Sequence, residues 1–259
     1  MSQVLEAALK RHLPRRGVPA RLQAAMRYTL FNAGKRLRPM LVLEVCKDLG
    51  GDLKNALPSA CAVEYIHTYS LIHDDLPAMD DDDMRRGKPS SHKKFDEATA
   101  ILAGDALQAA AFEAIARTPD PKLVAPMILA LAEGSGAAGM VGGQQIDLAP
   151  RAEVREIHAK KTAALFATST RLGALAARKG HVDELTRYGL HLGLAFQVVD
   201  DILDASERGR RNYARIYGMT QARRQAAREV AAAKSAIRFL GRKGETLAQI
   251  ADFVLSRKH

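Results

Sequence analysis

Six aspartates lie between His73 and Arg86, directly after a run of apolar residues with helical spacing. Like charges repel one another, so a folded chain tolerates this cluster only beside a strongly positive counter-species, and a divalent cation supplies more charge per volume than any side chain. Pro77 would end the apolar helix, and the turn after it would bring Asp80 back towards Asp74. Magnesium takes one or two carboxylates and fills its other positions with waters and substrate phosphates. The segment therefore predicts either a solvated acidic loop or a magnesium site at the end of a helix.

A second acidic stretch helps to decide between these two interpretations. Four polar residues recur at i, i+3, i+4 and i+7 on one stripe of a predicted helix with apolar neighbours: Gln197, Asp200, Asp201 and Asp204. Carboxylates in an otherwise apolar helix each need a partner or a shifted pKa, which makes them costly as structural filler. Such a helix would pack by its apolar side and aim its carboxylates into a cavity. The two acidic stretches together favour a magnesium site.

The residues around both stretches resemble the trans-isoprenyl diphosphate synthases, and within that family the bacterial farnesyl diphosphate synthases. The segment Tyr69–Gly87 is similar to those enzymes nearly residue for residue. Further similar segments follow the family's order along most of the chain: Gly34–Pro39, Ala103–Leu107, Gly142–Gln144, Lys161–Thr162 and Phe196–Asp204. The resemblance implies an all-α isoprenoid synthase fold and a prenyltransferase activity.

The resemblance also implies a magnesium-dependent condensation of isopentenyl diphosphate with dimethylallyl and then geranyl diphosphate, which gives farnesyl diphosphate. Three Mg²⁺ ions per active site are implied once substrate is bound. The residues implied to hold the metal are Asp74, Asp75, Asp80, Asp200, Asp201 and Asp204. The residues implied to bind the diphosphates are Lys35, Arg38, His67, Arg85, Arg86, Lys161, Thr162 and Gln197. The residues implied to act in catalysis are Asp74, Asp80, Lys161 and Asp200.

A residue five positions before Asp74 is predicted to set the product length. Tyr69 lies about 7–8 Å down the helix axis from Asp74 by the rise per residue, and roughly 140° round from it. Its direction into the product channel is therefore taken from the resemblance, in which an aromatic at this position marks farnesyl synthases. Ser70 is small and leaves Tyr69 as the candidate floor of the channel. The alternative is an ordinary tyrosine packed between helices.

Composition and spacing predict one all-α domain over residues 1–259, a bundle of roughly ten or more helices around a central apolar cavity. The sequence contains neither a Pro/Gly/Ser-rich linker nor alternating strand-like runs. Apolar periodicity and helix breakers place helices over residues 2–13, 20–32, 53–75, 94–117, 121–141, 153–179, 182–204, 221–240 and 245–257. Gly142 and Gly143 would let the backbone approach another segment closely near the rim of a pocket.

The formal net charge is +10, but the basic residues are scattered, so nucleic acid is not an expected partner. Eighteen apolar residues never run uninterrupted and the amino terminus lacks a signal-peptide core, so we expect no membrane span and a cytoplasmic protein. Cys46 and Cys61 lie in apolar runs and are expected to be buried. The family resemblance implies a homodimer with small-molecule diphosphates as its substrates.

Other functions are compatible with the same motifs. A geranylgeranyl or other short-chain polyprenyl diphosphate synthase shares them, and so does a non-catalytic homologue of the same fold. A terpene cyclase shares the first acidic motif, but its second motif normally carries Asn or Asp, Ser or Thr, and Glu in place of the aspartates at 200, 201 and 204. A basic nucleic-acid binder would show salt-sensitive binding and no magnesium-dependent turnover.

Two connections are shorter than in the family, one after Gln144 and one after Asp204. The second connection lacks the lysine that touches the allylic diphosphate in the family. Either both are true deletions, with Arg208, Arg210 or Arg211 as substitute cations, or the sequence omits segments that close over substrate. Catalytic competence of the chain depends on which explanation holds.

Overall fold

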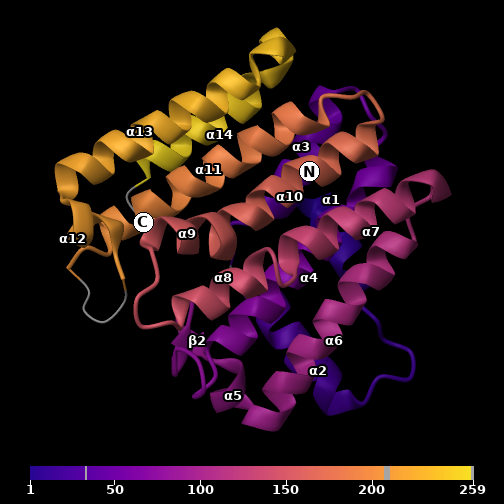
Figure 1. Ribbon diagram of the computed structural model, residues 1–259. Coiled ribbons are helices and arrows are strands. Elements are labelled where there is room, and N and C mark those ends of the chain that lie inside the picture. The colour runs from indigo at the N-terminus through magenta and orange to yellow at the C-terminus, as the bar shows by residue number, and fades with distance from the viewer. Residues whose placement is uncertain (33, 207–210, 258–259) are drawn as a thin grey trace.

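Two helices of 22 residues, α4 (Leu53–Asp74) and α11 (Val182–Leu203), carry the two acidic stretches at their carboxyl ends. The computed structural model describes residues 1–32, 34–206 and 211–257. Helix α10 packs against both α4 and α11, so the two long helices lie on either side of it. The position of the two acidic ends is therefore set by the helices at the centre of the bundle (Figure 1).

The remaining helices surround this centre. In chain order they are α1 (Ser2–His12), α2 (Ala20–Leu30), α3 (Leu37–Asp48), α5 (Ser91–Lys94), α6 (Glu97–Ala116), α7 (Pro121–Ser135), α8 (Met140–Asp147), α9 (Val154–Ile157), the π-helical η1 (His158–Ala163), α10 (Ala164–Ala177), α12 (Tyr213–Tyr217), α13 (Met219–Ala236), the 3-10 helix η2 (Arg238–Gly244) and α14 (Glu245–Ser256). One apolar core lies around α4 and a second lies between α11, α13 and α14. Cys46 and Cys61 are both buried, as expected. The predicted all-α bundle is confirmed.

The sequence sets both ends of α4. Asp52 caps the first turn, because its carboxylate accepts a hydrogen bond from the Lys54 N–H at 2.9 Å. At the other end α4 stops at Asp74, one residue before the predicted boundary, and Pro77 follows shortly after. The Asp80 N–H donates to the Asp74 carbonyl oxygen at 2.9 Å. The acidic turn is therefore closed, and it returns Asp80 to the end of α4 as the sequence predicts.

A two-stranded antiparallel hairpin follows the acidic turn, with β1 (Met84–Arg85) paired to β2 (Lys88–Pro89). Arg86 and Gly87 form its turn, with φ values of 53° and 75°. Positive φ at both central residues is the requirement of a type I′ turn, whose twist matches that of the flanking strands. This tight turn holds two arginines in fixed directions beside the acidic residues.

The helix predicted over residues 121–141 is broken in the structure. It ends at Ser135 and resumes at Met140, because Gly136 and Gly139 lie between with ψ values of −156° and −126°, which no helix contains. The helix predicted over residues 153–179 instead runs as α9, η1 and α10. A π-helical turn inside an α-helix is rare and occurs frequently at functional sites. The other predicted helices lie where expected, with their ends displaced by a few residues.

Helices α6 and α7 carry apolar side chains on their exposed faces. Ile101 and Leu102 of α6 are 44 % and 57 % exposed, and Leu129 of α7 is 56 % exposed. By length and composition alone, the stretches Glu97–Ala116 and Pro121–Asp147 are apolar enough to cross a membrane, and half or less of each is buried inside the molecule. The expectation that the chain has no membrane span therefore stays a prediction.

Candidate active site

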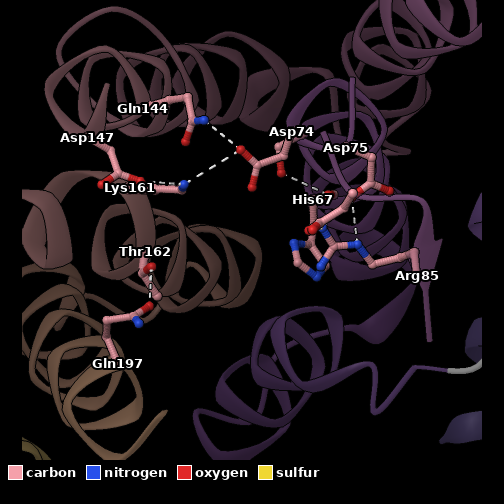
Figure 2. A network of polar contacts seen from close by, with 11 residues as sticks. His67, Asp74, Asp75, Arg85, Gln144, Asp147, Lys161, Thr162 and Gln197 are labelled. Carbon is pink, nitrogen blue, oxygen red and sulfur yellow. Dashed lines mark hydrogen bonds and ion pairs between the residues drawn. The ribbon is translucent and has the colours of Figure 1, made fainter. Parts of the chain in front are cut away.

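Asp74 faces two side chains from later elements (Figure 2). The side-chain amide of Gln144 in α8 donates to Asp74 Oδ1 at 2.5 Å, and Lys161 Nζ in η1 lies 3.6 Å from the same oxygen. Lys161 also pairs with Asp147 at 2.8 Å. Three segments far apart in the sequence therefore meet at one half-buried carboxylate. Gln144 and Asp147 are not among the site residues that the sequence predicts, and their i, i+3 spacing, which places both on one face of α8, is the signal that identifies them.

A glycine allows α8 and η1 to lie this close. A Cβ atom at Gly143 would lie 2.1 Å from the backbone nitrogen of Lys161 and 2.6 Å from the carbonyl carbon of Lys160. No side chain fits against backbone at that distance. The predicted close approach of the backbone at this glycine is confirmed, and it fixes the spacing between Gln144 and Lys161.

Arginines surround His67, which lies two turns below Asp74 on the same stripe of α4. Burial lowers the pKa of His67 well below its ordinary value, and the charges of Arg38 and Arg86 lower it further. Arg38 Nη1 lies 3.5 Å from His67 Nε2. The imidazole is therefore neutral near pH 7, and the side chains around it carry a surplus of positive charge that suits an anion.

Arg38 is partly buried, and one of its donors has no hydrogen-bond partner among the described residues. Its guanidinium lies 4.5 Å from the centroid of the Phe166 ring, and burial lowers the pKa of Arg38 to about 10. Arg38 Nε is buried and has no hydrogen-bond partner among the described residues. A partly buried cation with a free donor indicates a place for an acceptor, which a phosphate oxygen would fill. The other cations predicted to bind the same diphosphate lie close by: Lys35 is exposed at the same helix junction, and a Cβ atom at Gly34 would meet the Arg86 guanidinium at 2.6 Å.

Arg36, between the two predicted anion-binding residues of this junction, has a different role. Its guanidinium pairs with Glu64 at 2.5 Å and with Glu6 at 2.9 Å, and it donates to the Leu30 carbonyl at 2.6 Å. The Arg36 and Glu64 side chains are 9 % and 3 % exposed. This buried pair ties the amino-terminal helices to α4 and holds the junction that presents Arg38.

Asp75 and Arg85 neutralise each other. Arg85 Nε donates to Asp75 Oδ1 at 2.8 Å, and Arg85 Nη2 contacts the same oxygen and Asp82. Burial raises the pKa of Asp75, although the hydrogen bond from Arg85 opposes the shift. The pair therefore helps to hold the acidic turn in place, and the metal-binding role of Asp75 and the anion-binding role of Arg85 stay predictions.

The aspartates of α11 differ from one another in their surroundings. Asp200 pairs with Arg257, whose guanidinium also stacks on the Phe196 ring 3.8 Å from its centroid. Burial nevertheless raises the pKa of Asp200 to about 6. Asp204 is exposed at the carboxyl end of the helix. Arg257 therefore does not fully compensate the charge of Asp200, and a bound cation would stabilise its ionised form.

Asp201 belongs to a buried hydrogen-bonded network. It accepts from the Tyr213 N–H at 2.6 Å and lies 3.1 Å from His158 Nε2. The Gln197 amide donates to Asp201 at 3.3 Å, and the Gln197 carbonyl oxygen accepts from the Thr162 hydroxyl at 2.8 Å. With 6 % exposure, Asp201 anchors this network, and its role as a metal ligand stays a prediction.

The remaining carboxylates suit magnesium. Asp74 and Asp80 come from one closed turn, and Asp200 and Asp204 from the end of one helix. They offer oxygen donors that are partly open to solvent, and Mg²⁺ prefers a few carboxylates together with waters and phosphate oxygens. Of the six predicted metal ligands, these four would therefore be the most accessible to it.

The two short connections contact each other. Arg211 Nη2, after the second acidic stretch, donates to the Ala149 carbonyl oxygen after α8 at 2.6 Å. Of the three arginines considered as substitute cations, Arg211 therefore already donates a hydrogen bond to the connection after α8. Arg208 and Arg210 lie outside the described residues.

Sequence comparison finds prenyl diphosphate synthases that match nearly the whole chain. The farnesyl diphosphate synthase of Geobacillus stearothermophilus is 41% identical, over 99% of this chain and 95% of the relative. The geranylgeranyl diphosphate synthase of Cyanophora paradoxa is 38% identical, over 99% and 94%. Both alignments run over 283 positions, more than the 259 residues of this chain, so each relative has segments that this chain lacks.

Solved structures give the same result for the fold. The FPP/GFPP synthase of Zymomonas mobilis matches with a TM-score of 0.90 at 40% identity, over 98% of this chain and 95% of that one. The geranyltransferase of Legionella pneumophila matches with a TM-score of 0.90 at 37% identity, over 99% and 94%. The predicted isoprenoid synthase-type fold is thereby confirmed. The sequence model of the family "Polyprenyl synthetase" matches residues 19–213, and the chain belongs to this family of prenyltransferases.

Proposed function

We propose that this protein is a magnesium-dependent prenyltransferase that joins isopentenyl diphosphate to dimethylallyl and then geranyl diphosphate, with farnesyl diphosphate as its product. The observation that carries the proposal is that one stripe of α4 presents two different kinds of site, one acidic and one surrounded by arginines. Asp74 lies among groups that suit a metal, and His67 lies among arginines. A condensation of two diphosphates needs both sites, because one diphosphate must leave while the other stays bound.

The acidic side would bind the allylic diphosphate. Asp74, Asp80 and Asp200 would hold magnesium, which when bound supplies Lewis-acid stabilisation of the departing diphosphate. Lys161 adds a fixed positive charge on the same side, held by its contacts to Asp74 and Asp147. This charge stabilises the leaving group, and the departed diphosphate can accept the proton that the condensation releases.

The arginine side would bind isopentenyl diphosphate. Arg38, Arg86 and Lys35 offer charge-assisted hydrogen bonds to its phosphate oxygens. Neutral His67 can add a hydrogen bond without adding repulsion among these cations. A substrate held there has its double bond oriented towards the allylic carbon, which replaces a random encounter by a positioned one. The apolar interior of the bundle excludes water, which would otherwise capture the allylic cation.

The experiment that tests the proposal is product analysis with labelled isopentenyl diphosphate and either dimethylallyl or geranyl diphosphate, with Mg²⁺ and with EDTA. Turnover that requires both diphosphates and Mg²⁺ supports the proposal. A twenty-carbon product from the parent would favour a geranylgeranyl synthase, an activity that relatives of this chain also carry. Absence of turnover together with salt-sensitive nucleic-acid binding would contradict the enzyme assignment.

Tyr69 is the proposed limit on product length. It is 5 % exposed, and its ring meets the His73 ring edge-on with centroids 5.8 Å apart. Burial raises the pKa of the Tyr69 phenol, and Gln108 of α6 opposes that shift, so the ring lies between α4 and α6. Ser70 beside it is small and donates to the His67 carbonyl at 2.9 Å.

Tyr69→Ala should change the main product from fifteen carbons to twenty or more, because removing the ring leaves room for a further isoprene unit. Chromatography of the dephosphorylated products measures the chain length. Tyr69→Phe keeps the ring and serves as the matched control, which should still give fifteen carbons. An active Tyr69→Ala enzyme that stops at fifteen carbons would place the floor of the channel at another residue.

We also propose that the protein is a cytoplasmic homodimer. The support for the dimer is that α6 and α7 expose the apolar side chains of Ile101, Leu102 and Leu129, which a partner copy would cover. Leu102→Glu should convert the dimer into a monomer. Light scattering measures the molar mass that distinguishes the two states. Phe253→Glu is the control, because Phe253 is 52 % exposed on α14, away from this face. A parent protein that is monomeric at micromolar concentration would contradict the proposal.

A further inference from the structure

A second group of metal-ligand side chains lies at the base of the β1–β2 hairpin, apart from the proposed magnesium residues. The ligand atoms of Asp81, Asp83 and His92 all lie within 4.8 Å of one another. The hairpin brings them together, because the Ser90 N–H donates to the Asp83 carbonyl at 2.9 Å and His92 follows two residues later in α5. Residues before and after the hairpin therefore meet at one place.

His92 provides an observation independent of the acidic residues. It is 7 % exposed, and its Nδ1 lies 3.1 Å from Ser90 Oγ. Its Nε2 is buried and has no hydrogen-bond partner in the part of the chain that the structure describes. When Nδ1 donates its proton to Ser90, the lone pair of Nε2 is left available. Metal-ligating histidines have this arrangement, with one nitrogen held by an outer hydrogen bond and the other on the metal.

Both carboxylates of the group are exposed, and a lysine ammonium group lies beside one of them. Asp81 has a left-handed backbone, with φ of 52°, fixed by its N–H donating to the Leu76 carbonyl at 3.1 Å. Lys93 Nζ lies 2.9 Å from Asp83, so an ammonium group competes with any cation for this carboxylate. Asp82 between them instead contacts Arg85 at 3.1 Å and belongs to the other side of the turn.

We propose that Asp81, Asp83 and His92 form a binding site for one divalent transition-metal ion of the zinc class. Imidazole together with carboxylates suits Zn²⁺, whereas Mg²⁺ prefers oxygen ligands alone. Three protein ligands leave a position for water. A metal here cross-links the two ends of the hairpin that carries Arg85 and Arg86, and it does not use the residues proposed to hold magnesium.

The test is titration of the full chain with Zn²⁺ in competition with a chromophoric chelator, without any diphosphate. An Asp74→Asn, Asp200→Asn background removes two proposed magnesium ligands and should still bind one equivalent of Zn²⁺. Asp81→Asn and Asp83→Asn should each weaken binding by at least about tenfold. Asparagine also tolerates the left-handed backbone at position 81, so that variant keeps its fold.

Two further variants make the result specific. Lys93→Ala should bind Zn²⁺ more tightly than the parent, because it removes the competing ammonium. Asp82→Asn is the matched acidic control and should keep the parental affinity. His92→Gln should abolish Zn²⁺ binding. If this buried substitution unfolds the protein, the Zn²⁺ affinities of Asp81→Asn and Asp83→Asn test the proposal instead, because both aspartates are exposed. Equal Zn²⁺ affinity in all variants, or no stoichiometric binding by the parent, would overturn the proposal.

Discussion

Replacing Asp74 by asparagine should lower kcat by at least about a hundredfold while the protein stays folded. The amide keeps the shape of the side chain and can still accept the hydrogen bond from Gln144, but it loses the charge that faces Lys161 and would hold magnesium. Removing one electrostatic stabiliser from an active site costs about 3–4 kcal/mol of transition-state stabilisation. Steady-state kinetics at saturating substrates and circular dichroism measure the two parts of this prediction.

Asp252→Asn is the control for that variant. Asp252 lies on α14, where it accepts from Lys234 at 2.8 Å and is exposed. Its substitution should leave kcat at the parental value. A kcat for Asp74→Asn within tenfold of the parent would show that the proposed metal-binding role of this carboxylate is wrong.

Arg36→Met should lower the free energy of unfolding by about 3–5 kcal/mol, the cost of leaving one partner of a buried ion pair without the other. Glu64 is 3 % exposed in its side chain and would lose its closest ionic partner in the interior. Both arginine and methionine have an unbranched Cβ, so the left-handed backbone at this position, with φ of 50°, adds no new strain. Urea unfolding followed by circular dichroism measures the change.

The double variant Arg36→Met, Glu64→Met separates charge from packing. It removes both members of the pair and should recover much of the stability that the single variant loses, since apolar side chains of similar volume often replace buried ion pairs without cost. If the double variant were as unstable as the single one, the loss would come from the hydrogen bond to Leu30 and the contact to Glu6.

Both acidic helices are predictable from the sequence for a physical reason. Apolar residues at helical spacing run through α4 and α11 for 22 residues each, and Pro77 ends the first within one residue of the predicted place. The break between α7 and α8 is harder to predict, because a single glycine is only mildly unfavourable in a helix. Three glycines within six residues, Gly134, Gly136 and Gly139, are the feature of the sequence that could have predicted this break.

The distinct roles of neighbouring carboxylates are not predictable from local sequence. Asp75 differs from Asp74 through its pairing with Arg85 of β1, ten residues further along the chain. Asp200 differs from Asp201 through its pairing with Arg257, which lies 57 residues further along the chain. Spacing places such groups on one stripe of a helix, but long-range partners decide which of them stay open to a ligand.

In η1, a wide helical turn lets two consecutive residues contact opposite halves of the molecule. Lys161 lies against Asp74 of α4, and Thr162 donates to Gln197 of α11. Loss of one residue from this π-helical segment would restore an ordinary α-helix with its hydrogen bonds intact. It would also rotate α9 by about 100° relative to α10, so the two contacts could not both form. The number of residues in this segment, more than their chemical identity, therefore couples the two acidic helices.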